Sequence, residues 1–430
     1  MSTRIVILGA GTGGTLTANR LRRHYRNGDV SITVVDQDDR HVYQPGLLFV
    51  PFGLAQPEDI VRPRARQLHA GIEYLQVPID HVDIENDVVV LEGGRSLPYD
   101  VLVVATGAVL APEETEGLTG PGWGVSAFTF YDLPGATALE RALEGFEGGR
   151  MVVNLVDLPI KCPVAPLEFC FLADWYFHQR GLRDAVQLTY ATPLDGAFTK
   201  PVASAALGGL LEEKGVELVT EFNVGEVAYA EGGHGGRLVG YDGREVEFDL
   251  AVVIPLHDGA EYVGRSPGLG DELRFVSTDP ATLRSTAKEN VFAIGDATDL
   301  PVSKAGSVTH FEGEVLTENI VRHIEGRELD ASYDGHANCF IETGFSKALM
   351  IDFNYETEPL PGHFPGPVGV PLLKESRLNH LGKLMFQWFY WHTLLPGRDI
   401  PGVGADMPTR GKRRPDPAGE RAAPDEEENR

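Results

Sequence analysis

The chain has 430 residues, of which 42% are hydrophobic and 23% charged, with 50 glycines and 29 prolines. This length exceeds one simple domain, and this composition favours an α/β protein over a helical bundle or a disordered chain. The formal net charge of −26 excludes a nucleic-acid backbone as partner, because most of the surface would repel phosphate groups. Three cysteines are too few for a disulfide scaffold, so a thiol function, where there is one, is catalytic or regulatory.

The N-terminus enters strand-forming sequence at once and shows no basic region, apolar run and cleavage site in succession. We therefore predict no signal peptide and a protein that stays on the cytoplasmic side. The chain contains no run of about 18 apolar residues, so we expect no segment that crosses a bilayer.

The first 36 residues predict a strand over 4–8, a glycine turn, a helix, and a second strand that ends on Asp36. Gly9, Gly11 and Gly14 form the pattern GxGxxG between the first strand and the helix. Glycine at these positions allows a tight turn, close approach to a pyrophosphate and helix packing, and the helix N-terminus favours the anion. With Asp36 placed to bind ribose hydroxyls, these features predict a dinucleotide site.

Strands and helices continue to alternate along the chain. Buried strands are expected within 100–108, 149–157, 185–192 and 290–298, helices within 166–181, 202–216 and 313–326, and a hairpin within 232–248. This order predicts an α/β fold with two Rossmann-like domains, the second inserted in the first. The predicted division comprises a first domain in two parts (1–111 and 286–330), an inserted domain (112–285), a C-terminal membrane-associating region (331–405) and a disordered tail (406–430).

Two segments that follow buried strands, "ATGA" (105–108) and "NVFAIGDATDLP" (290–301), resemble the returning strands of flavoproteins with two dinucleotide-binding domains. The resemblance implies that the first site binds FAD rather than NAD. It places Thr106 and Gly107 at the cofactor and Asp296 against the ribityl chain.

The inserted domain lacks a second glycine-rich loop. At the corresponding strand end the sequence reads "PIKCPVAP" (159–166), with a cysteine and three prolines. Proline has no amide hydrogen and cannot contribute to a phosphate cradle, so we expect no nicotinamide cofactor and a different electron donor.

The segments around Cys162 ("IKCPVAPLEF") and Cys339 ("ANCFIETG") resemble the redox-cysteine segments of sulfide:quinone oxidoreductases. Segments 42–53 and 295–320 are similar to the same family, and the resemblance runs over residues 1–395. It implies a redox pair of Cys162 and Cys339 beside FAD, Gln44 and Lys304 at the cofactor, and a quinone as electron acceptor.

The chemistry of sulfur is consistent with this resemblance. Hydrosulfide can attack a disulfide or bridging polysulfide, and such exchange requires two sulfurs that meet. We expect Lys161 and the following helix N-terminus to lower the pKa of Cys162. The alternative for each cysteine is a buried small apolar side chain. We assign that role to Cys170, which does not match the family's third cysteine, so FAD is expected to bind non-covalently.

The sequence indicates the residues that transfer protons less clearly. Glu168 could accept a proton from incoming H₂S, or it could only complement the dipole of its helix. Lys304 is placed to stabilise negative charge on the reduced flavin or the quinone, and His310 is interpreted as structural. We predict no metal site.

Segment 377–395 predicts an amphipathic helix. It places an apolar stripe on one side and Asn379, Lys383 and Gln387 on the other. The stripe comprises Leu381, Leu384, Trp388, Trp391 and Leu395. An aromatic stripe with basic flanks is typical of a helix that lies on a membrane surface, although core or homo-oligomer packing remains the alternative. Phe345, Phe389 and Tyr390 are candidates for contact with a quinone ring.

Together these features predict FAD-dependent oxidation of sulfide to sulfane sulfur, with electrons passed to a membrane quinone at the cytoplasmic face of the cell membrane. Three alternatives stay open. One is a sulfide dehydrogenase subunit that reduces a cytochrome, and another is a type II NADH:quinone dehydrogenase. The third is a non-catalytic sulfane-sulfur sensor or carrier.

Overall fold

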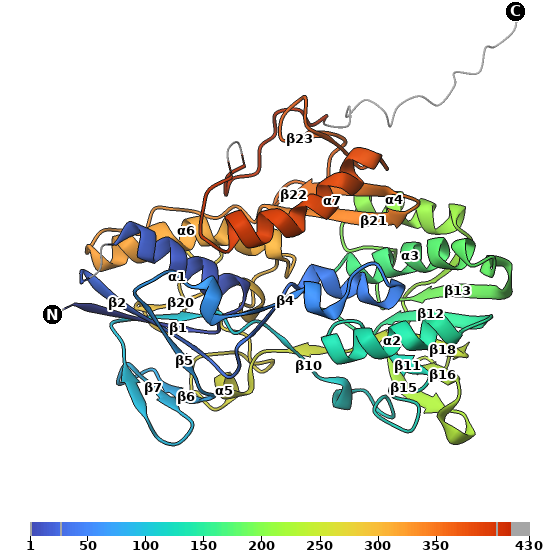
Figure 1. Cartoon of the computed structure of the whole chain (residues 1–430), viewed down its shortest axis with the longest axis horizontal. Helices are drawn as coiled ribbons and strands as arrows, with labels where there is room; N and C mark the ends of the chain where they lie inside the picture. The colour runs from blue at the N-terminus through green and yellow to red at the C-terminus, as the bar shows by residue number, and fades with distance from the viewer. Residues whose placement is uncertain (1, 26–27, 401–402, 414–430) are drawn as a thin grey trace, which may run out of the picture.

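The computed structural model describes residues 2–25, 28–400 and 403–413. Its fold is built on two five-stranded parallel sheets that lie one after the other along the longest axis (Figure 1). The predicted α/β class with two Rossmann-like sheets is therefore confirmed.

The first sheet has the strand order β20-β9-β1-β2-β5. Its strands are β1 (Thr3–Leu8), β2 (Val30–Asp36), β5 (Ile72–Gln76), β9 (Val101–Val104) and β20 (Val291–Ala293). Strand residues alternate between faces. Ile5 and Ile7 therefore pack toward α1 (Thr12–His24) and α6 (Gly306–Ile324), whereas Val6 and Leu8 pack on a three-stranded sheet, β6 (Ile79–Asp83), β7 (Val88–Leu91) and β8 (Ser96–Pro98).

The second sheet repeats this layering with the order β11-β18-β12-β13-β14. Its strands are β11 (Ala127–Phe128), β12 (Gly149–Leu155), β13 (Val186–Ala191), β14 (Val216–Val219) and β18 (Leu250–Ile254). One face carries α2 (Leu133–Gly145), α3 (Ala165–Gln179) and α4 (Pro201–Glu213), and the other carries β15 (Val224–Tyr229), β16 (Gly236–Gly240) and β17 (Glu245–Phe248). The predicted hairpin corresponds to β16 and β17.

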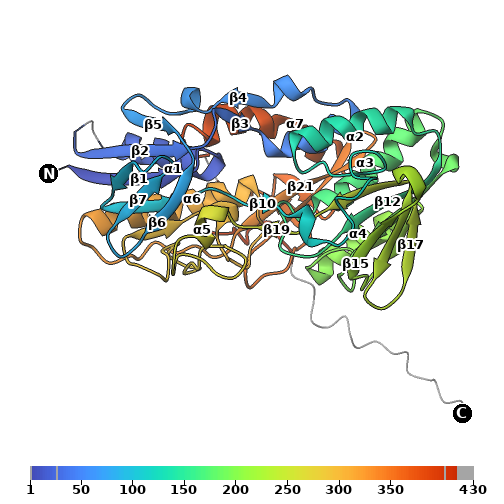
Figure 2. The same ribbon diagram turned by 90° about the horizontal axis from the view of Figure 1, so that it is seen from below.

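The chain crosses between the two sheets twice, and the two crossings run side by side. The outgoing strand β10 (Val109–Leu110) pairs with the returning strand β19 (His257–Asp258) in antiparallel fashion, and both lie between the two halves in Figure 2. The chain then rejoins the first sheet at β20, beside β9. The junction therefore lies at the carboxyl ends of β9 in the first sheet and β18 in the second.

The C-terminal region lies across the helices of both halves (Figure 1). Its hairpin of β21 (Ala337–Gly344) and β22 (Lys347–Phe353) contacts α3 and α6, and α7 (Arg377–Phe389) packs on the hairpin. A smaller hairpin of β23 (Gly362–Phe364) and β24 (Val370–Leu372) follows β22. This region therefore spans the junction between the two sheets.

Helix α7 presents its apolar side outward. Five of its apolar side chains are each between 52% and 58% exposed: Leu378, Leu381, Leu384, Met385 and Trp388. Asn379 and Lys383, which were expected on the side opposite the apolar stripe, point inward and are bonded to protein groups. None of the helices in the described part of the chain combines the length and apolar character needed to cross a membrane.

The predicted stripe is too long. A π-helical turn, Tyr390–Leu394, follows α7 and changes the angular spacing of the next residues. Trp391 and Leu395, which were expected to continue the stripe, are therefore buried in the core.

The predicted disordered tail begins too early. Residues 406–413 pack on the C-terminal region, where Lys412 forms an ion pair with Asp352 and Asp352 also contacts His336 at 2.9 Å. The side chains of Lys412 and Asp352 are 2% and 0% exposed. The rest of the predicted tail, 414–430, lies outside the described residues.

Lys412→Met is expected to destabilise the C-terminal region by about 3–5 kcal/mol, because it leaves the Asp352 carboxylate buried without its lysine partner. The shift in the denaturant midpoint of unfolding measures this effect. Arg410→Met, at an exposed position two residues earlier, is the control and should leave the midpoint unchanged. Equal midpoints for the two variants would show that the ion pair does not hold this segment.

Candidate functional site

The glycine turn between β1 and α1 requires glycine at two of its three predicted positions. Gly9 has a φ of +95°, and a Cβ there would lie 2.4 Å from the Ala105 oxygen. A Cβ on Gly14 would lie 1.8 Å from the Gly9 oxygen. Gly11 differs because a Cβ there would meet no atom within 4 Å, and Gly11 lines the cavity described below. Gly9 and Gly14 therefore shape the turn, and Gly11 leaves its backbone open to a ligand.

Asp36 ends β2 beside this turn. Its Oδ2 accepts a hydrogen bond from the Ala10 amide at 2.7 Å, and the carboxylate forms an ion pair with Arg64. Both side chains line the same cavity as Gly11. The carboxylate is thus held where a dinucleotide ribose would lie next to the glycine turn.

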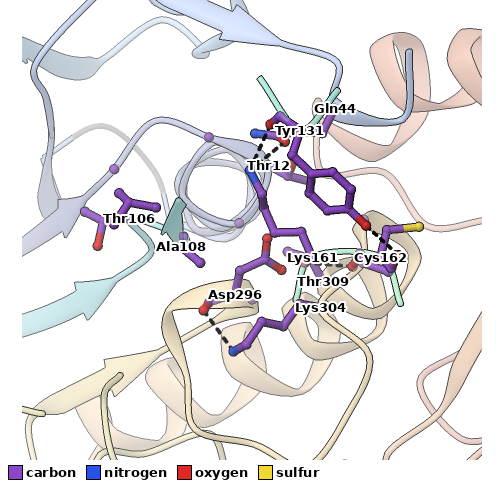
Figure 3. Close-up of a pocket in the computed structure, with 18 of the residues that line it drawn as sticks. Thr12, Gln44, Thr106, Ala108, Tyr131, Lys161, Cys162, Asp296, Lys304 and Thr309 are labelled. Atoms are coloured by element: carbon purple, nitrogen blue, oxygen red, sulfur yellow. Dashed lines mark hydrogen bonds between the residues drawn. The ribbon is translucent and has the colours of Figure 1, made fainter. Parts of the chain in front are cut away.

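A cavity of about 740 Å³ extends from the glycine turn to the junction between the two sheets (Figure 3). All of the predicted site residues except Gly14 line it: Gly9, Gly11, Asp36, Gln44, Thr106, Gly107, Cys162, Glu168, Asp296, Lys304 and Cys339. The cavity is within the size range of small-molecule and cofactor sites. An open glycine backbone at one end and a half-buried Asp296 carboxyl further along fit an elongated dinucleotide.

Cys162 lies at the start of α3 in an unusual backbone conformation. Its φ is +46°, a region that non-glycine residues seldom adopt and that is often found at functional sites. Its amide donates to the Lys304 oxygen at 2.7 Å, and its carbonyl accepts from the Ala165 amide at 2.9 Å. These bonds hold the residue that carries the thiol between the inserted sheet and α6.

Cys339 comes from β21, in the C-terminal region, and reaches the same cavity. The two thiols are close enough for the charge of Cys162 to raise the pKa of Cys339 further, after burial. All three cysteines are free thiols in the structure. Cys170 is 1% exposed within the core, away from the cavity lining, as expected.

The expected lowering of the pKa of Cys162 is wrong. Burial raises it to about 12, and the nearby Glu168 carboxylate adds to the increase. Lys161 does not offset this effect, because its Nζ lies 3.3 Å from both the Gln44 Oε1 and the Tyr131 oxygen. The cation that favours the Cys162 thiolate is Lys383 of α7, on the side of the helix opposite the apolar stripe.

Glu168 and Lys383 form a buried ion pair at the cavity wall. The Glu168 carboxylate also accepts a hydrogen bond from the Glu342 amide at 2.7 Å, and Lys383 donates to the Phe340 oxygen at 2.9 Å. Burial raises the pKa of Glu168, although Lys383 opposes the shift. Glu168 therefore lies beside Cys162 as a carboxylate with increased proton affinity. This environment favours a role in proton transfer over a role limited to complementing the helix dipole.

Lys304 lines the cavity, and its ammonium group is held by two carbonyls. Its Nζ donates to the oxygens of Asp296 at 3.0 Å and Thr298 at 2.6 Å. The first turn of α6, from Gly306, also lines the cavity and brings the positive end of the helix dipole to it. The predicted helix begins at 313, seven residues after the observed start of α6, so the helix dipole at the cavity was not predicted.

The quinone candidates separate in space. Tyr390 lines the large cavity, Phe345 lines a second cavity, and Phe389 lines neither. Phe386, one helical turn before Tyr390, also lines the large cavity and was not predicted, because it lies on the side of the helix opposite the apolar stripe. His310 lies in α6, 2% exposed and outside both cavity linings, with Glu314 at 3.7 Å.

Comparison with known proteins supports this description. Residues 3–146 match the family described as pyridine nucleotide-disulphide oxidoreductase. The chain is 26% identical over 396 residues to the mitochondrial sulfide:quinone oxidoreductase of Mus musculus, covering 91% of this chain and 86% of that protein. It is 27% identical over 407 residues to the Dictyostelium discoideum protein of the same name, covering 92% and 86%.

The fold matches the X-ray structure of the sulfide:quinone oxidoreductase from Aquifex aeolicus with a TM-score of 0.79 and 21% identity over 92% of each chain. The fold, the cavity and these relatives define the class, and the chain is a flavin-dependent oxidoreductase with two Rossmann-like sheets. Within that class, the resemblance to sulfide:quinone oxidoreductases drawn from the sequence is confirmed.

Gly11→Ala is expected to preserve the fold and weaken flavin binding. The added methyl group enters open space at the cavity wall, and overpacking of this kind costs about 1–3 kcal/mol, or roughly tenfold to hundredfold in affinity. Flavin absorbance after purification and titration measures the loss. Gly14→Ala is the contrasting variant, because its methyl collides with the backbone and lowers stability with or without flavin. Unchanged flavin affinity in Gly11→Ala would place the cofactor elsewhere.

Proposed function

We propose that the chain oxidises sulfide to sulfane sulfur on Cys162 and Cys339 and passes the electrons through FAD to a membrane quinone. The observation that carries this proposal is that two cysteines from distant segments line the same cavity as the dinucleotide turn. When bound, the flavin supplies two-electron chemistry between the sulfur and the quinone.

Non-covalent binding of FAD is proposed from the cavity lining. Gly11 and Asp36 would hold the dinucleotide end, Thr106 and Gly107 the middle, and Asp296 the ribityl chain. Gln44 and Lys304 would lie near the ring. The third cysteine, Cys170, is enclosed in the core and offers no point of attachment at the cavity.

The sulfur step is an exchange between hydrosulfide and the disulfide of the two cysteines. Hydrosulfide attacks one sulfur of the oxidised Cys162–Cys339 pair, the bond between the two cysteine sulfurs breaks, and one cysteine becomes a persulfide. The other leaves as a thiolate. Two-electron oxidation then joins this sulfur to the outer sulfur of the persulfide, which releases the persulfide proton and passes two electrons to the acceptor. Glu168, with its raised proton affinity, is placed to accept the proton of incoming H₂S.

The acceptor end of the cavity lies at α7. Lys383, Phe386 and Tyr390 line the cavity from this helix, and its opposite side carries the exposed apolar stripe. A quinone taken from the bilayer would therefore meet aromatic rings and one cation on entering. The chain would sit peripherally on the cytoplasmic face of the cell membrane.

The basic flank of α7 is weaker than the sequence suggests, because Lys383 is paired inside the protein. Lys374 and Arg377 remain exposed near the start of the helix. Membrane contact would thus depend mainly on apolar side chains. The exposed stripe favours a lipid-soluble quinone over a cytochrome as the electron acceptor.

Anaerobic titration tests the reaction. Sulfide, and not NADH, is expected to bleach the bound flavin, and a soluble quinone analogue should restore the colour over many turnovers. Cys162→Ser and Cys339→Ser should each abolish bleaching by sulfide, while Cys170→Ser should keep most of it. Rapid bleaching by NADH alone would refute the proposal, and persulfide formation without sustained quinone reduction would indicate a sensor or carrier.

Flotation with neutral phosphatidylcholine vesicles tests the membrane contact. The double variant Leu384→Gln/Trp388→Gln should bind at least about tenfold more weakly, because burying one such side chain contributes roughly 1.5–3 kcal/mol. Tyr241→Gln removes an aromatic side chain that is 84% exposed on another part of the molecule and is the matched control. Equal loss of binding in the control would remove the role assigned to α7.

A further inference from the structure

A second cavity of about 290 Å³ lies beside the large one, between α7, β21 and α3. Leu54, Phe345 and Leu384, which are 43% to 52% exposed, line it on the outer side. Tyr43 and Lys383 line both cavities. The side chain of Lys383 therefore separates a pocket that reaches the surface from the proposed reaction chamber.

Three acid–base groups besides Tyr43 line this second cavity, namely Glu342, His380 and Lys383. The His380 Nδ1 lies 3.0 and 2.9 Å from the two carboxylate oxygens of Glu342. The Glu342 amide and the Lys383 ammonium group both bind the Glu168 carboxylate. These groups form one polar cluster, in which Glu342 meets Glu168 through its backbone amide and acts on Lys383 through the charge of its carboxylate.

Exposure decreases along this cluster toward the large cavity. The side chain of His380 is 22% exposed and that of Lys383 11%, whereas Glu342 and Glu168 are 2% and 1% exposed. Only the histidine end is therefore open to protons from outside. The carboxylates behind it are shielded from solvent.

The charges around Glu342 suit a group that changes protonation. Burial raises its pKa, while His380, Lys383 and Glu168 act on it from two neighbouring elements. Burial lowers the pKa of Lys383, but the Glu168 carboxylate and the Cys162 thiolate more than offset this, so that it is raised overall. Lys383 is thus kept as a charged proton donor, and Glu342 can be reached by a proton.

The proposed reaction needs a proton from outside. Reduction of a quinone to a quinol takes two electrons and two protons, whereas oxidation of hydrosulfide to bound sulfane sulfur releases two electrons and one proton. With hydrosulfide as the substrate, one further proton therefore comes from solvent, and the second cavity offers it a route to Lys383. The proton released by sulfide can be taken up at Glu168, which is paired with Lys383.

We propose that His380 and Glu342 form the proton inlet of the quinone half-reaction and that Lys383 delivers the proton to the acceptor. His380 takes a proton at the second cavity and passes it to the Glu342 carboxylate. The flexible Lys383 side chain, which borders both cavities, donates its own proton to the acceptor oxygen and is recharged from Glu342. This inference rests on the proposed quinone reduction.

Stopped-flow measurement of the two half-reactions in the flavin-loaded protein tests the inlet. Glu342→Gln and His380→Asn are expected to slow reoxidation of the reduced flavin by a soluble quinone analogue by on the order of 10²-fold, the effect of losing proton transfer. Reduction by sulfide should keep its rate. Reoxidation by ferricyanide, which takes electrons without protons, should also keep its rate. A variant that is misfolded or slow in electron transfer would instead react slowly with ferricyanide as well.

The controls remove similar side chains nearby. Glu375→Gln and His392→Asn alter a carboxylate before α7 and an exposed histidine after it, and neither residue lines either cavity. Both should reoxidise with quinone at the normal rate. As an independent readout, infrared difference spectra of oxidised and sulfide-reduced protein should contain a carboxyl band that Glu342→Gln removes.

The outcomes are distinguishable. Normal quinone reoxidation in both inlet variants overturns the inlet while leaving sulfide:quinone chemistry in place. Equal slowing with ferricyanide also overturns it, because the variants would then impair the fold or electron transfer. If sulfide fails to reduce the unaltered protein, both the proposed function and the inlet fall.

Discussion

A backbone bridge beside the cavity links the two halves of the site. The amide of Cys162 donates to the Lys304 oxygen at 2.7 Å, joining the segment after β12 to the segment before α6. The bridge fixes Cys162 at a positive φ, which costs about 1–3 kcal/mol and persists only where the surroundings enforce it. Because each end of the bridge belongs to a different sheet, the thiol keeps its place only when both sheets are assembled.

The C-terminal region completes this arrangement from a third direction. Lys383 pairs with Glu168 and ties α7 to α3, while β21 brings Cys339 to the same cavity. A buried ion pair is a poor source of net stability, since the desolvation of two charges offsets most of their attraction. The pair is better understood as a device that places a cation beside the thiols and couples α7, with its exposed apolar side, to the cavity behind it.

The parts of the fold that could be predicted are those encoded locally. The GxGxxG turn with Asp36, the buried strands and most helices follow from short-range pattern and turn chemistry. Cys162 and Cys339 could be paired only through resemblance, since nothing in their spacing brings them together. The inward orientation of Lys383, the burial of Trp391 after the π-helical turn and the raised pKa of Cys162 depend on tertiary packing. The apolar stripe of α7 follows from the helical periodicity of the sequence. Periodicity does not determine which side of a helix faces solvent.

The burial of the two thiols bears on the proposed sulfur chemistry. Burial raises the pKa of both Cys162 and Cys339, so two free thiolates side by side are unfavourable there. Sulfur bonded to sulfur carries no such charge, and a disulfide or polysulfide bridge is therefore favoured over the ionised pair. A thiolate released by hydrosulfide would be short-lived for the same reason, and Lys383 is the cation that stabilises it long enough to react.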